Sequence, residues 1–193
     1  MRGRGATARL FVAVYPPEEV RAACLGALRG LGPGLDPAHR ETPVEQVHLT
    51  LLFVGHVAEK EMGEVAESVE RSAAGVGAFR LTPLRLVCFP ERGMPRLVAV
   101  ELDAPAGLME VRRRLVKRLA RERRSTGGTP VPLETERFSP HMTLCRFGGE
   151  ARARRVGREV SLPGFSVSEI VLFRSVLRPG GAVHSEVLRA RLR

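Results

Sequence analysis

The sequence predicts an α+β fold of largely antiparallel sheets, built as two lobes within one domain of residues 1–193. Strand-like segments join through short turns, which favours antiparallel over parallel pairing. A four-residue motif, H-[LM]-T-L, begins at His48 and again at His141, about half the chain length further on. This repeat indicates a duplicated architecture with one such strand in each lobe. Residues 1–8 are expected to form a flexible basic extension.

Hydrophobic periodicity predicts the elements of the first half of the chain. The first strand ends at two prolines, and the helix after it places Val20, Cys24, Leu28 and Leu31 on one face. In chain order we expect a strand (9–15), a helix from about residue 17, a loop (32–43), a strand (47–55) and a helix (59–74).

The second half begins with two strands that form a hairpin through Gly93-Met94-Pro95. The third helix carries an apolar stripe of Leu108, Val111, Leu115 and Leu119. In chain order we expect strands 79–89 and 96–102, a helix (106–123), a loop (125–136), a strand (141–147), and two closing strands (165–174 and 183–192) around a turn at 178–181.

Composition narrows the class of protein. Hydrophobic residues make up 44% and charged residues 27%, and no apolar run approaches the ~20 residues of a membrane span. Cys24, Cys88 and Cys145 form no C-x-x-C pair, which argues against disulfides or a cysteine zinc site and fits the cytoplasm. The net charge of +10 favours a polyanionic partner such as nucleic acid, although a composition this rich in arginine can also reflect the genome.

The two H-x-T motifs bring together groups that can transfer protons. Side chains at positions i and i+2 of a strand share a face, so His48 lies beside Thr50 and His141 beside Thr143. Displacement at phosphorus needs a base on the nucleophile and an acid on the leaving oxygen, and histidine, with a pKa near ~6.5, serves as either. The threonine hydroxyls can donate to the phosphate oxygens.

Other chemistry has little support in the sequence. No acidic cluster adjoins either motif, and there is no glycine-rich nucleotide-binding loop, so neither a metal nor a cofactor is expected. The competing interpretation is that the two histidines are core residues of unrelated strands. The matching motif, in strand-like contexts both times, argues against it.

The whole set of segments resembles the two-histidine (2H) phosphoesterases. Within that superfamily it is similar to the RNA 2′,3′-cyclic phosphodiesterases, also called 2′-5′ RNA ligases of the LigT type. The resemblance is carried by RLFVAVYPPEEV, VHLTLLFVGHV, FPERGMPRLVAVEL, RFSPHMTLCR and LFRSVLRPGGAVHSEVL. It implies two lobes with outer helices, a central cleft, and metal-free hydrolysis of RNA 2′,3′-cyclic phosphate ends to 2′-phosphomonoesters.

The resemblance also implies roles for individual residues. His48 would be the proton donor to the leaving 3′ oxygen and His141 the proton acceptor that activates water, while Thr50 and Thr143 would hold the phosphate. The residues themselves leave open which histidine is the acid. Arg146 completes the family's H-x-T-L-x-R pattern and is expected to bind phosphate, but strict alternation puts it on the opposite face unless a bulge or a long reach corrects this.

Two further residues are candidates for substrate contact. Phe11 could stack on a base or fill the core, and His184 stands where the family often has a tyrosine, so it is either structural or touches substrate. The arginine-rich third helix either binds RNA phosphates or is a solvated face.

The expected partners are RNA ends with a 2′,3′-cyclic phosphate, or small cyclic nucleotides, bound by a monomer with no membrane association. The alternatives are the reverse reaction, which would join RNA ends through a 2′-5′ linkage, and a non-catalytic RNA-binding module of the same fold.

Overall fold

A computed structural model describes residues 6–32, 39–125, 138–148, 155–178 and 181–193, with only the backbone for 121–125. The expected loop at 125–136 and the centre of the turn at 178–181 fall almost wholly outside these residues. In chain order the elements are β1 (Thr7–Val14), α1 (Glu18–Arg29), β2 (His39–Glu41), η2 (Val44–Gln46), β3 (Leu49–Ala58), η3 (Glu59–Glu61), α2 (Met62–Ala73), β4 (Phe79–Leu81), β5 (Pro83–Phe89), β6 (Leu97–Leu102), α3 (Ala106–Ser125), β7 (His141–Phe147), β8 (Gly157–Glu159), β9 (Phe165–Val167), β10 (Glu169–Arg178) and β11 (Gly181–Arg191).

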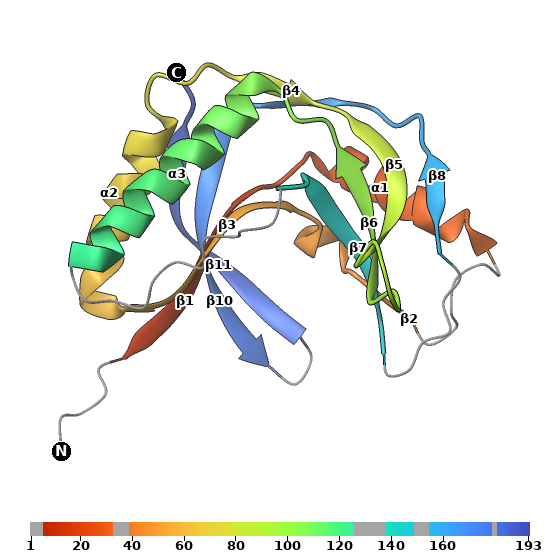
Figure 1. The fold of residues 1–193 in the computed structure, drawn as a ribbon, viewed down its shortest axis with the longest axis horizontal. Helices are drawn as coiled ribbons and strands as arrows, with labels where there is room; N and C mark the ends of the chain where they lie inside the picture. Colours follow the sequence, from red (N-terminus) through yellow and green to blue (C-terminus); the bar gives the residue numbers. More distant parts are fainter. Residues whose placement is uncertain (1–5, 33–38, 126–137, 149–154, 179–180) are drawn as a thin grey trace.

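The described strands form one nine-stranded sheet and a separate two-stranded sheet, with antiparallel pairing throughout. The large sheet runs β11-β10-β1-β3 in one lobe and β7-β6-β5-β8 in the other, with β2 added beside β7 (Figure 1). The lobes meet where Leu49 of β3 pairs with Met142 of β7. The predicted fold class is therefore confirmed, and the sheets of the two lobes are joined into one.

The two lobes repeat one local backbone pattern. In lobe one Ala13 of β1 pairs with Thr50, and in lobe two Ala99 of β6 pairs with Thr143. In both pairs the register shifts directly after the threonine, so one residue of the H-x-T strand is left over, which is the mark of a β-bulge. The duplication suggested by the sequence thus extends to the backbone on either side of the motifs.

The helices described by the structure pack on one face of the large sheet. Helices α2 and α3 pack on each other and on β3, β10 and β11, whereas α1 packs against β7 (Figure 1). The predicted apolar stripe of α3 is fully buried, as are Leu49 and Met142, so the core lies between helices and sheet. Burial of these aliphatic side chains is the main force that holds the layers together.

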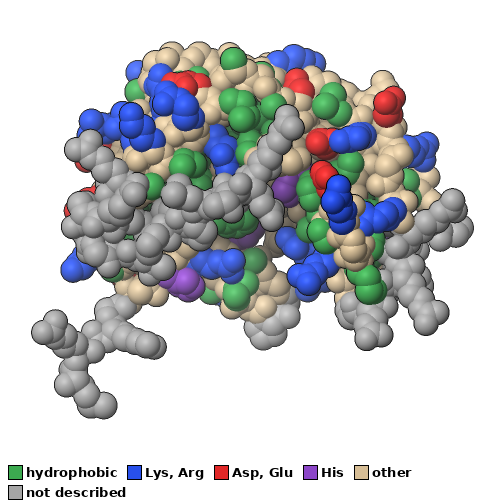
Figure 2. All heavy atoms as spheres, viewed as in Figure 1, with side chains coloured by type: hydrophobic (Ala, Val, Ile, Leu, Met, Phe, Trp, Pro, Cys, Tyr) green, Lys and Arg blue, Asp and Glu red, His purple; other side chains and the backbone are tan. Residues whose placement is uncertain are grey.

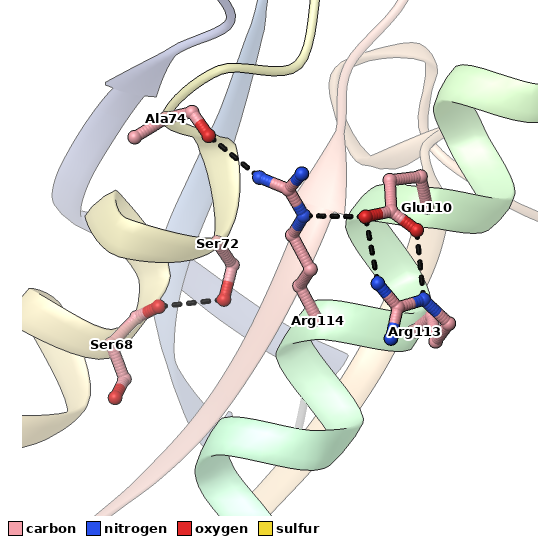
Figure 3. Close-up of polar contacts among 6 residues, drawn as sticks. All are labelled: Ser68, Ser72, Ala74, Glu110, Arg113 and Arg114. Atoms are coloured by element: carbon pink, nitrogen blue, oxygen red, sulfur yellow. Dashed lines mark hydrogen bonds and ion pairs between the residues drawn. The ribbon is translucent and has the colours of Figure 1, made fainter.

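The arginines of α3 make contacts within the protein. Arg113 and Arg114 both hydrogen-bond to Glu110, and Arg114 also donates to the carbonyl of Ala74 at the end of α2 (Figure 3). These bonds hold the pKa of Glu110 at about 2, well below its usual range. Arg112 lies over the ring of Phe138, 4.2 Å from its centroid. These contacts favour a structural role for the described part of this helix over RNA binding.

The structure corrects several element boundaries. β1 begins at Thr7, and Ala8 is buried, so the expected extension of residues 1–8 is too long. Strand β2 lies within the segment expected to be a loop. The sequence did not predict it, because its three residues carry no periodicity of their own and form a strand by pairing along the edge of β7. The expected strands 79–89 and 165–174 each divide, and their first parts, β4 and β9, pair with each other.

Strand β8 was not anticipated from the sequence. Strand β3 continues beyond Gly55, where the pairing with β1 shifts by one residue, and glycine readily adopts the φ of 85° found there. No helix among the described residues is long and apolar enough to span a membrane.

Candidate active site

The two H-x-T motifs lie side by side at the junction of the lobes. Leu49 and Met142 pair across β3 and β7 and are both fully buried on the helix side. Continuing this antiparallel register sets His48 opposite Thr143 and Thr50 opposite His141, on the face away from the helices. Opposed Cβ atoms in such pairs are about 5 Å apart. The two imidazoles and two hydroxyls therefore form one compact group, as the sequence predicts for strands that line one cleft.

A backbone carbonyl fixes the orientation of each imidazole. His48 Nδ1 lies 2.6 Å from the carbonyl oxygen of Gln46, and His141 Nδ1 lies 2.8 Å from that of Ser139. A carbonyl oxygen can only accept, so Nδ1 carries the hydrogen in both rings and Nε2 is the atom left to exchange protons. Both histidines thus present the same nitrogen for chemistry.

The residues that supply these carbonyls are themselves anchored. The Gln46 side chain donates to the carbonyl of Ala182 at 3.0 Å, which ties η2 to the start of β11. The Ser139 hydroxyl donates to Glu101 at 3.3 Å. Each histidine is therefore held by a carbonyl whose position depends on a second contact, and such support keeps a proton-transfer group in place.

Aromatic rings surround His48. The ring of Tyr15 stacks on it at a centroid distance of 5.0 Å, and the rings of Phe11 and His184 lie at 5.2 and 5.4 Å. The Tyr15 hydroxyl is hydrogen-bonded to His184 Nδ1 at 3.0 Å. Burial raises the pKa of Tyr15 to about 12, so this hydroxyl keeps its proton.

This environment disfavours the charged form of His48. Burial lowers its pKa to about 4, and the charges of His184, His141 and Arg146 act in the same direction. The hydrogen bond to the Gln46 carbonyl opposes these effects only in part. At neutral pH the imidazole of His48 is therefore neutral.

His141 has different neighbours. The ring of Phe89 lies 4.6 Å from it, and Glu101 of β6 is its direct partner across the strand pair. Glu101 forms an ion pair with Arg85 on β5 and accepts from Ser139. A carboxylate–guanidinium pair thus lies beside His141. Val14 pairs with Leu49, so the next pair in this antiparallel register is Tyr15 with His48, and Tyr15 takes the position beside His48 that Glu101 takes beside His141.

The β-bulge brings Arg146 to the histidine face. Leu144 and Cys145 are both fully buried although they are consecutive, and Arg146 after them is exposed. The leftover residue therefore reverses the alternation, and Arg146 faces the same way as His141 and Thr143. A phosphate-binding role for Arg146 requires this orientation. The charge of Arg146 also contributes to lowering the pKa of His48.

Phe53 is a site residue that sequence reasoning missed. Leu51 and Leu52 are buried together after Thr50, so Phe53 occupies in β3 the position that Arg146 occupies in β7. Its side chain is 49% exposed and its ring lies 6.2 Å from that of Phe11. The signal in the sequence was the pair of consecutive apolar residues that follows the threonine in both motifs.

Phe11 and His184 take different places in this group. Phe11 is only 3% exposed and lies beneath His48, Phe53, Phe173 and His184, so its core role is the better supported one. His184 borders a groove of about 560 Å³ together with Tyr15 and Gln46.

A larger hollow of about 1350 Å³ adjoins His141, because Phe89, Glu101 and Ser139 line it. Neighbours of His48 thus line the groove and neighbours of His141 the larger hollow, and Figure 2 shows histidine side chains in the depression between the lobes. In the part of the chain that the structure describes, no three His, Cys, Asp or Glu side chains are grouped to hold a metal ion.

The fold and the paired motifs define a 2H phosphoesterase. A model of the 2′-5′ RNA ligase superfamily matches residues 16–177, and the chain belongs to this superfamily. An RNA 2′,3′-cyclic phosphodiesterase of Thermus thermophilus is 34% identical, with 96% of this chain and 90% of that protein covered. A relative of the same name from Aeropyrum pernix is 29% identical over 80% of this chain and 89% of its own length.

Solved structures show the same fold. The protein TT0787 of Thermus thermophilus superposes with a TM-score of 0.80 at 31% identity, covering 96% of this chain and 98% of that one. Escherichia coli LigT complexed with 3′-AMP has a TM-score of 0.77 at 24% identity, covering 97% and 99%. The family resemblance seen in the sequence is confirmed.

Proposed function

We propose that this protein hydrolyses RNA 2′,3′-cyclic phosphodiester ends to 2′-phosphomonoesters without a metal ion, with His48 and His141 moving the protons. The observation that carries the proposal is the matched pair of imidazoles, each with Nδ1 bound to a carbonyl and Nε2 left for proton transfer. The relatives named RNA 2′,3′-cyclic phosphodiesterase support the same reaction.

The groups around the two imidazoles suit a phosphate. Thr50 lies opposite His141 and Thr143 opposite His48, and both hydroxyls can donate hydrogen bonds to the non-bridging oxygens. Arg146 adds a positive charge on the same face. Charge that develops on phosphorus oxygens is stabilised by donors already in place, so these three residues are the proposed phosphate ligands.

In the proposed mechanism His141 takes a proton from water, the water oxygen attacks phosphorus, and His48 gives a proton to the leaving 3′ oxygen. Donation requires a protonated His48, whereas burial holds its pKa at about 4. The negative cyclic phosphate reverses the local charge balance and favours the imidazolium, so protonation accompanies substrate binding. The exchanged assignment, with His48 as base, uses the neutral form directly and is the alternative to test.

A substrate with sulfur in place of the bridging 3′ oxygen separates the two assignments. A thiolate leaves without a proton, so loss of the general acid costs little with this substrate. We expect the sulfur substrate to restore most of the activity of His48→Ala and little of that of His141→Ala. Restoration of His141→Ala alone would show that the roles are exchanged, and restoration of neither would contradict a two-histidine acid–base mechanism.

The reverse reaction is the second candidate, because the matching superfamily is named for 2′-5′ RNA ligases. The same acid–base pair would run it by microscopic reversibility. Incubating RNA with a cyclic-phosphate end and RNA with a 5′-hydroxyl end, then sequencing the products, distinguishes joining from hydrolysis. The non-catalytic alternative predicts neither product and binding that survives loss of both histidines.

The cellular setting is also a proposal. Cys24, Cys88 and Cys145 are buried free thiols, which suits the reducing cytoplasm. We infer that the protein acts there as a monomer on RNA ends, with small cyclic nucleotides as simpler substrates. His184 borders the groove beside His48 and is the proposed additional contact for the substrate.

A further inference from the structure

Two arginines face each other on neighbouring strands at one end of the histidine group. Arg40 of β2 is the register partner of Arg146 of β7. Partners in an antiparallel pair share a face, and Arg146 lies on the histidine face because of the β-bulge. Glu41, the next residue of β2, pairs with buried Cys145 and forms an ion pair with Arg29 of α1, on the helix side. The pairing of Arg40 with Arg146 and the opposite facing of its neighbour Glu41 both place Arg40 on the histidine face.

The side chain of Arg40 also reaches the other lobe. A Cβ added to Gly181, the first residue of β11, would lie 3.1 Å from Nη2 of Arg40. Gly181 has a φ of 127°, and its lack of a side chain leaves this approach open. Next to it, the Ala182 carbonyl accepts from Gln46, whose own carbonyl holds His48. Arg40 therefore spans the end of the site, from β2 to the hairpin that braces His48.

Charge makes this end of the site suited to an anion. Arg40 and Arg146 place two positively charged side chains directly opposite each other on paired strands. Within the described residues no carboxylate forms an ion pair with Arg146, and the nearest acidic residue of β2, Glu41, is taken up on the other face. Figure 2 shows Lys and Arg side chains gathered beside the depression between the lobes. Two guanidinium groups on one face of the sheet attract an anion to this end of the site.

We propose that Arg40, next to Arg146, binds a second phosphate of the substrate, the phosphodiester on the 5′ side of the nucleotide that carries the cyclic phosphate. Thr143 and Arg146 pair with residues of β6 that are two positions apart, about 7 Å of strand. Arg40 lies beside Arg146 on the next strand, so it is one step further out than the groups around the reacting phosphate. The preferred substrate is then an oligonucleotide end, and a nucleoside 2′,3′-cyclic monophosphate lacks one of the two anions. This inference rests on the proposed hydrolysis.

The test compares three substrates with the same terminal nucleoside 2′,3′-cyclic phosphate: one with a 5′-hydroxyl, one with a 5′-phosphate, and a dinucleotide. For the unaltered protein we expect kcat/KM to rise when the 5′-phosphate or the phosphodiester is present. In Arg40→Gln this preference should fall by about tenfold, as for loss of one charge-assisted contact. The salt dependence of log kcat/KM for the dinucleotide should also become shallower by about 0.7.

A matched control removes the same charge elsewhere. Arg71 lies exposed on α2, so Arg71→Gln lowers the net charge equally and should keep the full preference. Arg40→Lys keeps a positive charge and should retain part of the preference, which separates charge loss from a disturbed hairpin.

Equal preference in Arg40→Gln and Arg71→Gln would overturn the inference while leaving hydrolysis intact. A dinucleotide advantage that the 5′-phosphate does not reproduce would also overturn it, because the contact would then be to the added nucleoside. Absence of hydrolysis for all three substrates would instead reject the proposed function, and this inference with it.

Discussion

His48 lies among aromatic rings, whereas His141, its counterpart in the other lobe, lies beside a carboxylate and an arginine. The partner across the strand pair is Tyr15 for the first and Glu101 for the second, and the residue placed on the site face by the β-bulge is Phe53 in one lobe and Arg146 in the other. The two lobes repeat the backbone around the H-x-T motifs, but the side chains next to the two histidines differ. A duplicated scaffold therefore supplies two imidazoles in matching orientation, and the surroundings of His48 lower the pKa of that imidazole.

The largest expected effect comes from removing either imidazole. His48→Ala and His141→Ala should each lower hydrolysis by at least ~10², because each deletes one proton transfer. Steady-state kinetics on an RNA with a 2′,3′-cyclic phosphate end, with thermal unfolding as the control for folding, measures this. Near-parental activity in either variant would contradict the proposal that both histidines transfer protons.

The next effect compares the two residues that the bulges place on the site face. Arg146→Gln removes a charge from a phosphate ligand and should lower kcat/KM by roughly 10- to 100-fold. Phe53→Leu keeps apolar bulk and should cost less than about threefold in the same assay. A larger loss for Phe53→Leu than for Arg146→Gln would show that the aromatic lobe, rather than the charged one, makes the stronger contact with substrate.

The aromatic surroundings of His48 should also appear in the pH dependence of stability. The unfolded chain binds a proton at this imidazole near pH ~6.5, whereas the folded protein does so only near the lowered pKa of about 4. Falling pH therefore favours unfolding between these values, by on the order of 3 kcal/mol, and the effect levels off below the lower one.

Chemical denaturation at several pH values measures this contribution. His48→Asn cannot titrate there and should lose less stability than the unaltered protein as the pH falls through that window. Identical pH profiles for the two proteins would contradict the account of His48.

A smaller effect is expected from the hydrogen bond between Tyr15 and His184. Tyr15→Phe keeps the ring that stacks on His48 and removes the hydroxyl, so kcat should fall by only about two- to fivefold. Because Tyr15 acts as a positioning residue, the pH–rate profile should shift while KM stays close to its original value. Tyr15→Leu also removes the stacking and should cost more, and an equal loss in both variants would assign the whole effect to the hydroxyl.

The sequence was sufficient to predict the features that depend on a local pattern of residues. Thr50, His141 and Thr143 lie on the strands that the motifs predicted, and His48 lies directly before β3. The α3 stripe and the hairpin of β5 and β6 were also anticipated correctly. These features depend on periodicity and turn chemistry, both of which are properties of a short segment.

What the sequence could not show depends on partner strands. The facing of Arg146 and Phe53 follows from bulges that exist only in the pairing with β6 and β1, so alternation alone gave the wrong face. Strand β2 is held by the edge of β7, and the position of Arg40 follows from that pairing. The contact of Tyr15 with His184 joins residues far apart in the chain, which no local pattern reveals.

The most direct test of the central claim is to incubate the protein, in EDTA, with a short RNA that ends in a 2′,3′-cyclic phosphate and to determine the position of the phosphate in the product. The account predicts a 2′-phosphate whose formation is unaffected by the chelator and needs both His48 and His141. Loss of turnover in EDTA with recovery on added metal, or a 3′-phosphate product, would contradict it.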